Sequence, residues 1–498
     1  APGFWALKLT FCPLEPKVDM TRKMNHKLSI LRLLIGRPTG IFSMILLLGL
    51  LVQACMEHSA EPQAGIGAPK VILIIGDGMD DQQITIARNY LLGAGGRLAL
   101  DGLPVRSAAR VETVSEDRPD QPIYVADSAN SATSMATGIV TSLGRIATTA
   151  KTDRDIETIM ELAQAAGLGT GVVTTSSVTD ATPASFVAHV NQRYCEGPLG
   201  MVRFIEQLQL SVDCSQDEKS SGGKGSIAEQ IALSGLDIVL GGGSRYFEQT
   251  TEEGSERTVL DVAHQNGFQI IYAQEELGGV PKTEKILGLF SRGTMPVWLQ
   301  GVDGAQAQRV ERVEGQVNLP EPFLCEPNPD FEGIPSLADM TGAALDHLDD
   351  GRGFMLMIES ASIDKQSHQR RPCGHIGELS QLDDALKVAL DFAEKNSGTL
   401  ILVTADHAHA AQIIADQGPH LALNYTTPGY LARVRTREGG IMSINYATNE
   451  SPQEMHTGAQ VPVFANMPGV RELTGLMRQS DIYNISANHL GLTVSADR

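Results

Sequence analysis

Several acidic and histidine side chains have the types and spacings of metal ligands. Asp364 and His368 are four residues apart, so on a helix both side chains would project from one face. Asp406 and His407 are neighbours just after an apolar stretch. Further candidates of the same kind are Asp77, Glu359 and His456. Carboxylates with imidazoles suit zinc, and carboxylates with a hydroxyl suit magnesium. Each residue by itself is more commonly a surface acid or a hydrogen-bonded core histidine, so only the combination predicts a metal site.

The sequence DSANSAT at residues 127–133 contains a candidate nucleophile, Ser128. It follows the short apolar stretch 123–126 and precedes small residues that can open a helix. A serine at a helix start faces free backbone N–H groups and the positive end of the helix dipole, which favour a bound anion and an alkoxide. An Asp-Ser pair that only caps a helix has the same sequence, so the motif alone is compatible with both roles.

The elements that must position these residues are apolar stretches with the composition of buried strands. The stretches are VILII at 71–75, IYVA at 123–126, GVV at 171–173, FMLMI at 354–358 and LILV at 400–403, and polar candidates follow them. Because helical stretches such as 376–394 lie between them, the pattern predicts an α/β layer fold with a mostly parallel sheet. Ligands of such sheets bind beyond the carboxyl ends of the strands. Four candidate residues at equivalent strand ends therefore predict one shared site.

The bulk composition limits the partners of the chain. Of its 498 residues, 42% are hydrophobic and 20% are charged, as in an ordinary globular protein, and the net charge is −20. Such a charge repels polyanions, so we expect no nucleic-acid partner. It also repels phosphate esters unless local cations overcome it, and bound metal ions would do so.

The N-terminal region has the pattern of an export signal. Residues 24–37 are basic and lack acids, and the uncharged stretch 41–52 is too short to span a bilayer but has the length of a signal-peptide core. The sequence VQAC at 52–55 is similar to a lipoprotein processing box, which predicts an acylated Cys55. We therefore expect an upstream extension and signal peptide over 1–54, a short tether over 55–66, and a catalytic domain over 67–498 with a loop-rich excursion at about 417–455.

Four cysteines remain in the expected mature chain, namely Cys195, Cys214, Cys325 and Cys373. They can pair in three ways. Sequential pairing closes loops of modest size and suits an oxidising periplasm, whereas four separate buried thiols are the alternative.

Six motifs together resemble those of alkaline phosphatases. They are GDGM at 76–79, DSANSAT at 127–133, DATPASFVAHVNQR at 180–193, ESASIDKQSH at 359–368, TADHAHA at 404–410 and HTG at 456–458. They occur in the order of the family, cover the chain from about residue 70 onward, and are most similar to those of bacterial members. The resemblance implies a three-layer α/β/α sandwich, sequential disulfides and a homodimer. It also implies broad hydrolysis of phosphate monoesters through a phosphoserine, with a role in phosphate scavenging in the periplasm or cell envelope.

The resemblance also implies a role for each motif residue, at a site with two zinc ions and one magnesium ion. Asp364, His368 and His456 would bind the first zinc ion. Asp77, Asp406 and His407 would bind the second, with Ser128 as its fourth ligand. Asp77, Thr182 and Glu359 would bind magnesium. Arg193 would bind two phosphate oxygens, Asp180 and Lys365 would contact magnesium-bound water and phosphate, and His409 would support the zinc site.

Two positions depart from the family pattern. Asp80 stands where members usually have glycine, and we expect strain there if that glycine adopts a positive φ. Ser367 stands where some bacterial members have aspartate, which leaves the details of magnesium or phosphate binding open.

Two other functions compete with this interpretation. A phosphodiesterase or sulfatase of the wider two-metal superfamily is one, although the sequence has no Cys/Ser-x-Pro-x-Arg sulfatase signature. A non-catalytic lipoprotein that binds metal or phosphate is the other. It predicts at least one altered catalytic position, whereas every expected catalytic residue is present.

Overall fold

The computed structural model describes residues 67–494 apart from 207–208, 252–255, 311, 315, 417–428 and 447. The contacts divide the chain into Ala1–Gly65 and Ile66–Arg498, and the second unit contains the fold. The expected signal peptide and Cys55 lie outside the described residues. Within the described part of the chain, no helix is long and apolar enough to span a bilayer.

A ten-stranded sheet forms the centre of this unit, in the order β22-β2-β21-β17-β1-β16-β5-β8-β10-β9. The seven strands at one end of this order are parallel: β17 (Thr399–Ala405), β1 (Lys70–Gly76), β16 (Phe354–Ser360), β5 (Gly169–Ser177), β8 (Ile238–Gly242), β10 (Lys285–Leu289) and β9 (Phe268–Ile271). The antiparallel strand β21 (Val461–Ala465) joins them to β2 (Val105–Arg110) and β22 (Leu476–Arg478). Every residue of β1, β16 and β17 is buried, as expected for strands covered on both faces. The prediction of a mostly parallel α/β sheet is confirmed. The stretch 123–126 is an exception, because only a two-residue strand, β4 (Pro122–Ile123), forms there, pairs with β3 (Thr113–Val114) outside this sheet, and is followed by the exposed Tyr124.

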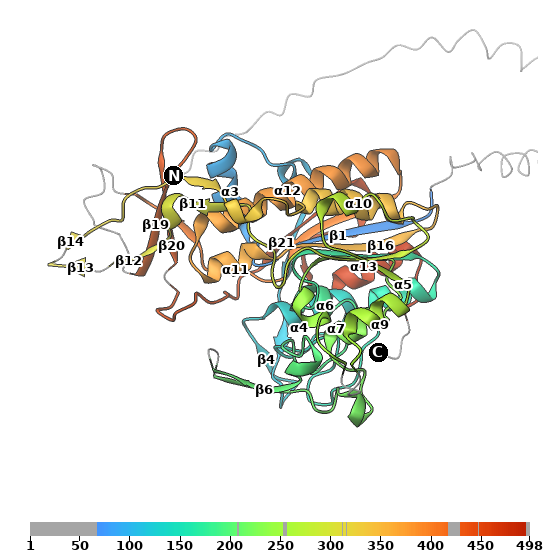
Figure 1. Cartoon of the computed structure of the whole chain (residues 1–498). Coiled ribbons are helices and arrows are strands. Elements are labelled where there is room, and N and C mark those ends of the chain that lie inside the picture. Colours follow the sequence, from blue (N-terminus) through green and yellow to red (C-terminus); the bar gives the residue numbers. More distant parts are fainter. Residues whose placement is uncertain are drawn as a thin grey trace, which may run out of the picture. The chain divides into compact units, whose positions relative to one another are not determined.

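Helices cover both faces of this sheet (Figure 1). On one face, α10 (Leu337–Leu348) and α12 (Pro372–Lys395) pack on the central strands, and α3 (Asp81–Leu92) and α11 (Ser362–His368) pack on α12. On the other face lie α5 (Ile159–Ala165), α6 (Ala181–Ala184) and α13 (Asp481–Leu490), with α4 (Ser128–Thr137) packed on α6 and α13. This arrangement is the expected three-layer sandwich.

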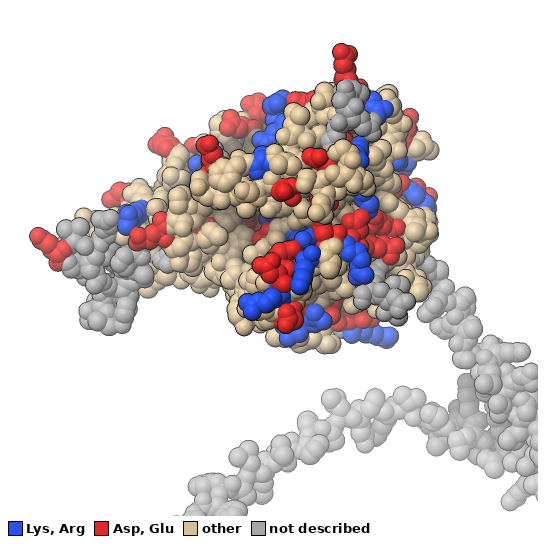
Figure 2. All heavy atoms as spheres, turned by 90° about the horizontal axis from the view of Figure 1, so that it is seen from below, with Lys and Arg blue, Asp and Glu red and all other residues tan. Residues whose placement is uncertain are grey.

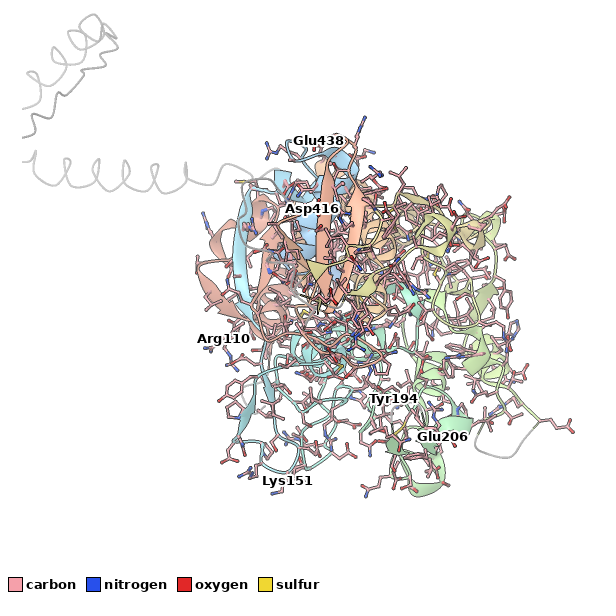
Figure 3. The ribbon with its side chains drawn as sticks, turned by 90° about the vertical axis from the view of Figure 1, so that its left-hand side faces the viewer. Arg110, Lys151, Tyr194, Glu206, Asp416 and Glu438 are labelled. Atoms are coloured by element: carbon pink, nitrogen blue, oxygen red, sulfur yellow. A yellow bond between two sulfur atoms is a disulfide. The ribbon has the colours of Figure 1, made fainter. Side chains whose placement is uncertain are left out.

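A second, four-stranded antiparallel sheet corrects one expectation. Its order is β12 (Gln308–Val310), β19 (Gly429–Arg435), β20 (Ile441–Tyr446) and β18 (Gln412–Ile414). Two of its strands lie inside the segment 417–455 that we expected to be rich in loops. Their apolar residues, such as Leu431 and Ile444, are fully buried, but glycine, threonine and asparagine around them hide the strand pattern in the sequence. Figure 3 shows Asp416 and Glu438 beside this sheet, where Asp416 pairs with Arg433 at 2.9 Å.

Two disulfides join Cys195 to Cys214 and Cys325 to Cys373. They confirm the sequential pairing that the resemblance implied. Cys373 lies in the first turn of α12, and Cys325 begins β15 (Cys325–Pro327), which pairs with β11 (Leu299–Gly301). The second disulfide therefore fastens this pair of strands to the helix that directly follows α11.

Acidic and basic side chains lie next to one another on the face that Figure 2 shows. The described residues also form exposed ion pairs, such as Lys282 with Asp346 and Arg292 with Glu248. Exposed pairs contribute little to stability, about 0–1 kcal/mol each. On this face the net negative charge is therefore not gathered into one patch.

Candidate active site

The register of three parallel strands brings the first set of candidates together. β1 lies between β16 and β17, and Gly76 is paired with Ser360 on one side and Ala405 on the other. The residues at these strand ends consequently meet at one edge of the sheet. Asp77 N–H donates to the Ser360 carbonyl at 3.1 Å, and Gly78 N–H donates to Asp406 Oδ1 at 2.9 Å.

Ser128 lies against these strand ends at the first position of α4. Asp127 caps the helix by accepting the Asn130 N–H, so the backbone directs the first turn of α4 toward the site. Ser128 Oγ is 3.5 Å from Asp77 Oδ1 and 3.3 Å from His407 Nε2. We call Asp77, Ser128, Asp406 and His407 the strand-end group.

A second group of side chains comes from α11, from the residues after β17 and from the segment before β21. His368 Nε2 lies 3.3 Å from Asp364 Oδ2, and His456 Nε2 lies 3.3 Å from Asp364 Oδ1. His409 Nε2 is 3.4 Å from the same Oδ1 atom, and the Nε2 atoms of His368 and His456 are 3.0 Å apart. We call Asp364, His368, His409 and His456 the arm group. Its His456 ring stacks on His407 of the strand-end group, with 3.6 Å between ring centroids.

Within the arm group, His409 has a different role from the other histidines. Its Nδ1 accepts the Ala410 N–H at 2.9 Å, so in the neutral ring the proton is on Nε2, which faces Asp364. Burial lowers the pKa of His409 well below its usual value, which keeps the ring neutral. His409 is thus placed to hydrogen-bond a ligand rather than to bind metal itself.

Glu359 and Thr182 lie buried on the side of the site next to β5. Thr174 Oγ1 donates to Glu359 Oε2 at 2.5 Å, and Ser176 Oγ donates to the same oxygen at 3.3 Å. Burial and the charge of Asp180 raise the pKa of Glu359 to about 7. Thr182, in α6, is equally buried.

Two cations border the site and are held by two aspartates. Arg193 pairs with Asp127 at 3.3 Å and with Asp180 at 3.1 Å, and Lys365 Nζ pairs with Asp180 at 2.5 Å. Although burial lowers the pKa of both cations, the neighbouring carboxylates raise it above the usual value, so both stay charged. Figure 3 labels Tyr194, over whose ring the Arg193 guanidinium lies at 5.9 Å.

The carboxylates of the site fit bound cations. Burial, together with the charges of Asp364 and Asp406, raises the pKa of Asp77 well above its usual value, so ionised neighbours here need a compensating positive charge. Among the expected metal ligands, three buried oxygens have no hydrogen bond of good geometry to a described residue, namely Thr182 Oγ1, Asp364 Oδ1 and Asp406 Oδ2. Two sets have ligand atoms within 4.8 Å of one another, Asp364 with His368, His409 and His456, and Asp77 with Asp364 and His407. Such oxygen and nitrogen donors suit divalent metal ions.

The two departures from the family pattern are both accommodated. Asp80 has φ −85° in an extended conformation, and the positive φ of this turn belongs to Gly78 at 70°. The expected strain at Asp80 is therefore wrong. Its carboxylate caps α3 by accepting from Gln82 and Gln83, and it also accepts the His409 N–H at 3.2 Å.

Ser367, the second departure, connects two helices, and three residues that support the site were not predicted from the sequence, namely Gln83, Arg370 and Glu454. Ser367 Oγ accepts from Gln83 Nε2 at 2.8 Å and donates to the Ile363 carbonyl at 2.7 Å, which links α3 to α11. Arg370 and Glu454 form a buried pair at 3.0 Å next to His368. Glutamine and arginine at such positions carry no signal in a single sequence, because their partners are distant along the chain.

Comparisons with known proteins agree with this geometry. The family described as "Alkaline phosphatase" matches residues 68–453. The chain is 39% identical over 434 residues to an alkaline phosphatase of Escherichia coli, covering 85% of this chain and 86% of that one. It is also 39% identical over 454 residues to a streptomycin-6-phosphate phosphatase of Streptomyces griseus, covering 89% and 95%.

A solved structure, the alkaline phosphatase from the Antarctic bacterium TAB5, shares the fold. Its TM-score is 0.61 at 24% identity, with 86% of this chain and all of that chain covered. The family match spans most of the sequence and the relatives cover nearly the whole fold. The chain therefore belongs to the alkaline phosphatase family of phosphomonoester hydrolases.

Proposed function

We propose that the chain hydrolyses a broad range of phosphate monoesters through a covalent phosphoserine at Ser128. The observation that carries this proposal is the position of Ser128 Oγ, 3.3 Å from His407 Nε2 and 3.5 Å from Asp77 Oδ1, at the first turn of a helix. A serine that only capped the helix would not need a carboxylate and an imidazole beside its hydroxyl. The capping residue of this helix is Asp127 and not Ser128.

The residues that would hold metal ions fall into three sets. Asp364, His368 and His456 suit one zinc ion, and Asp77, Asp406 and His407, with Ser128, suit a second. Asp77, Thr182 and Glu359 suit a magnesium ion. Bound divalent ions supply positive charge that neutralises the buried carboxylates and stabilises the charge of a phosphate ester during its transfer.

The proposed reaction has two steps. Ser128 Oγ attacks phosphorus as its hydroxyl loses a proton, a new O–P bond forms while the ester bond to the alcohol breaks, and a proton ends on the released alcohol. Water then cleaves the phosphoserine, which releases inorganic phosphate and restores the hydroxyl. Phosphoryl transfer depends mainly on positioning and electrostatic stabilisation, since the protein does little covalent chemistry.

Arg193 and Lys365 supply this positioning from the open side of the site. Two carboxylates, Asp127 and Asp180, hold the Arg193 guanidinium, whose planar fork matches two phosphate oxygens. Lys365 adds a second positive charge through its contact with Asp180. The roles assigned to these residues concern the metal ions and the phosphate and none concerns the alcohol, which supports broad specificity for monoesters.

Hydrolysis of 4-nitrophenyl phosphate by the wild type and Ser128→Ala tests the proposal. Each protein is assayed with zinc and magnesium and again after chelation, and wild-type protein quenched during turnover is examined by mass spectrometry for phosphorylated Ser128. We expect activity and phosphoserine only in the metal-loaded wild type. Faster hydrolysis of bis(4-nitrophenyl) phosphate would favour a phosphodiesterase, and phosphate binding without phosphoserine would favour a non-catalytic binding lipoprotein.

We further propose that the protein is exported to the periplasm or cell envelope, is anchored there through an acylated Cys55, and acts in phosphate scavenging as a homodimer. The basic and apolar pattern of residues 24–52 and the sequence VQAC at 52–55 support the export and the anchor, and the family resemblance supports the dimer. Mass spectrometry of the mature N-terminus in wild type and Cys55→Ala tests the anchor. Light scattering of the purified protein tests the dimer.

A further inference from the structure

A buried arginine outside the expected site residues holds the segment that carries His456. Arg370 lies two residues after His368 and is 4% exposed. Its Nε donates to Glu454 Oε2 at 3.0 Å, its Nη1 to the Pro452 carbonyl at 3.2 Å and its Nη2 to the Ser451 carbonyl at 2.9 Å. All three nitrogens of one guanidinium thus bind the stretch just before His456.

Glu454 completes this connection on the other side. Its carboxylate is fully buried and also accepts from Asn449 Nδ2 at 3.0 Å and from the Thr448 hydroxyl. Its backbone N–H donates to the His368 carbonyl at 2.9 Å, and its carbonyl accepts from His368 Nδ1. The same residue therefore fixes both the main chain and the ring of His368.

The backbone of Arg370 indicates that these contacts determine its conformation. Its φ is 58°, in the left-handed region, which costs a non-glycine residue about 1 kcal/mol or more. The guanidinium also packs on the ring of Tyr430 in β19, with 3.9 Å to the ring centroid. A buried ion pair adds little net stability over apolar packing, but loss of one partner leaves an uncompensated buried charge.

The arm group needs such a support because no strand pairing among the described residues joins His368 to His456; the isolated bridge between Ala408 and Thr457 joins His456 to the end of β17 instead. His368 and His456 are 88 residues apart, and their side chains, with 22% and 12% exposure, are the most open of the expected ligands in these two groups. His456 is held on its other side by Nδ1, which contacts the Ala126 carbonyl at 2.9 Å. The Arg370 and Glu454 contacts hold the stretch before His456 to α11, whereas the stretch after it is held to the end of β17, where Thr457 N–H donates to the Ala408 carbonyl at 3.0 Å.

We infer that Arg370 is a positioning residue that acts through Glu454. It sets the place of His456 relative to His368 and so the affinity of Asp364, His368 and His456 for their metal ion. This inference rests on the proposed function, in that these three residues bind one metal ion. Residues that orient metal ligands typically affect affinity by about 10–100-fold.

The test compares Arg370→Met with a matched control, Arg433→Met. Arg433 likewise pairs with a carboxylate, the half-buried Asp416, and donates to the Pro320 carbonyl, but it lies in β19 away from the ligands. Zinc affinity and stoichiometry are measured by competition with a chelator, the ligand field by the absorption spectrum of the cobalt-loaded protein, and stability by thermal unfolding. We expect Arg370→Met to lower the affinity of one of the metal ions about 10–100-fold and to alter the cobalt spectrum. Arg433→Met should change only the thermal stability.

Two milder variants keep the test decisive if Arg370→Met does not fold. Arg370→Lys retains the charge and should restore part of the affinity, whereas Glu454→Gln should resemble Arg370→Met in metal binding. Affinities within twofold of wild type in these variants, or an equal loss in Arg433→Met, would overturn the inference. Failure of the wild type itself to bind metal or hydrolyse monoesters would instead reject the proposed function.

Discussion

The strand-end group and the arm group touch through the stacked rings of His407 and His456, but different kinds of contact hold them. In the strand-end group, parallel pairing of β1 and β17 sets where Asp77 and Asp406 lie, and their side chains are at most 3% exposed. In the arm group, side-chain hydrogen bonds and one ion pair bring His456 to α11. The comparison suggests that the sheet fixes one half of the site rigidly and that the other half can be altered without disturbing the sheet.

The largest expected effect is on Ser128 in the strand-end group. Ser128→Ala removes the attacking oxygen, and loss of a covalent nucleophile should reduce kcat for 4-nitrophenyl phosphate by about a thousandfold or more. Because the other ligands remain, metal stoichiometry should stay at the wild-type value. Activity within tenfold of wild type would show that the strand-end group acts only as a metal site.

The second prediction concerns the buried carboxyl of Glu378 in α12, whose protonation should affect the stability of the fold. Glu378 accepts from Thr175 and Gln381, and burial raises its pKa from 4.5 to about 7. The folded chain therefore binds this proton more tightly than the unfolded chain, so the stabilisation is complete below about pH 4.5 and is lost as the pH rises through 7.

Glu378→Gln should consequently gain free energy of unfolding relative to wild type as the pH rises, by up to about 3 kcal/mol between pH 4.5 and 8. Denaturant unfolding of both proteins at several pH values measures this difference. A constant difference between the two proteins across this range would contradict it.

Asp80 links the two groups, since it follows Asp77 closely and accepts the His409 N–H. Asp80→Gly removes the cap of α3 and leaves a buried N–H without its acceptor, which should destabilise the fold by about 1–2 kcal/mol. The exposed neighbour Asp81, changed to alanine, serves as control and should shift stability by less than about 0.5 kcal/mol. Equal effects of both substitutions in denaturant unfolding would show that the contact with His409 contributes nothing.

The smallest expected effect is a difference between the two groups in the rate at which a chelator removes their metal ions, and it compares the groups directly. The arm histidines are more exposed than the strand-end ligands, so a chelator should remove the metal of the arm group about tenfold faster. Release is followed with a coloured chelator, and His456→Ala should abolish the fast phase. Release in one phase, or loss of the slow phase in this variant, would contradict the difference between the groups.

The same division separates what the sequence could predict from what it could not. Apolar strands followed by polar residues are a local pattern, so the positions of Asp77, Glu359 and Asp406 at one sheet edge were predictable. The spacing of Asp364 and His368 on a helix was equally local, and it is confirmed by α11. The placement of His456 came only from the resemblance of its motif.

The remaining features depend on contacts between distant segments. Arg370 and Glu454 are 84 residues apart, and nothing near either residue indicates the other. The strands β19 and β20 were missed because their partners, and not their own composition, bury them. At Asp80 the error was local, since an extended aspartate that caps a helix can replace glycine without strain.

The pairing of β1 with β17 has a consequence for the time at which the site appears during folding. Gly78 and Asp406 are hydrogen-bonded although 328 residues separate them, and contacts between such distant segments form slowly because a long loop must close first. A nascent chain therefore contains only scattered carboxylates and histidines until β17 and the His456 segment have been synthesised and docked. During refolding, the recovery of hydrolysis should accordingly be among the last signals to appear, after secondary structure and compaction.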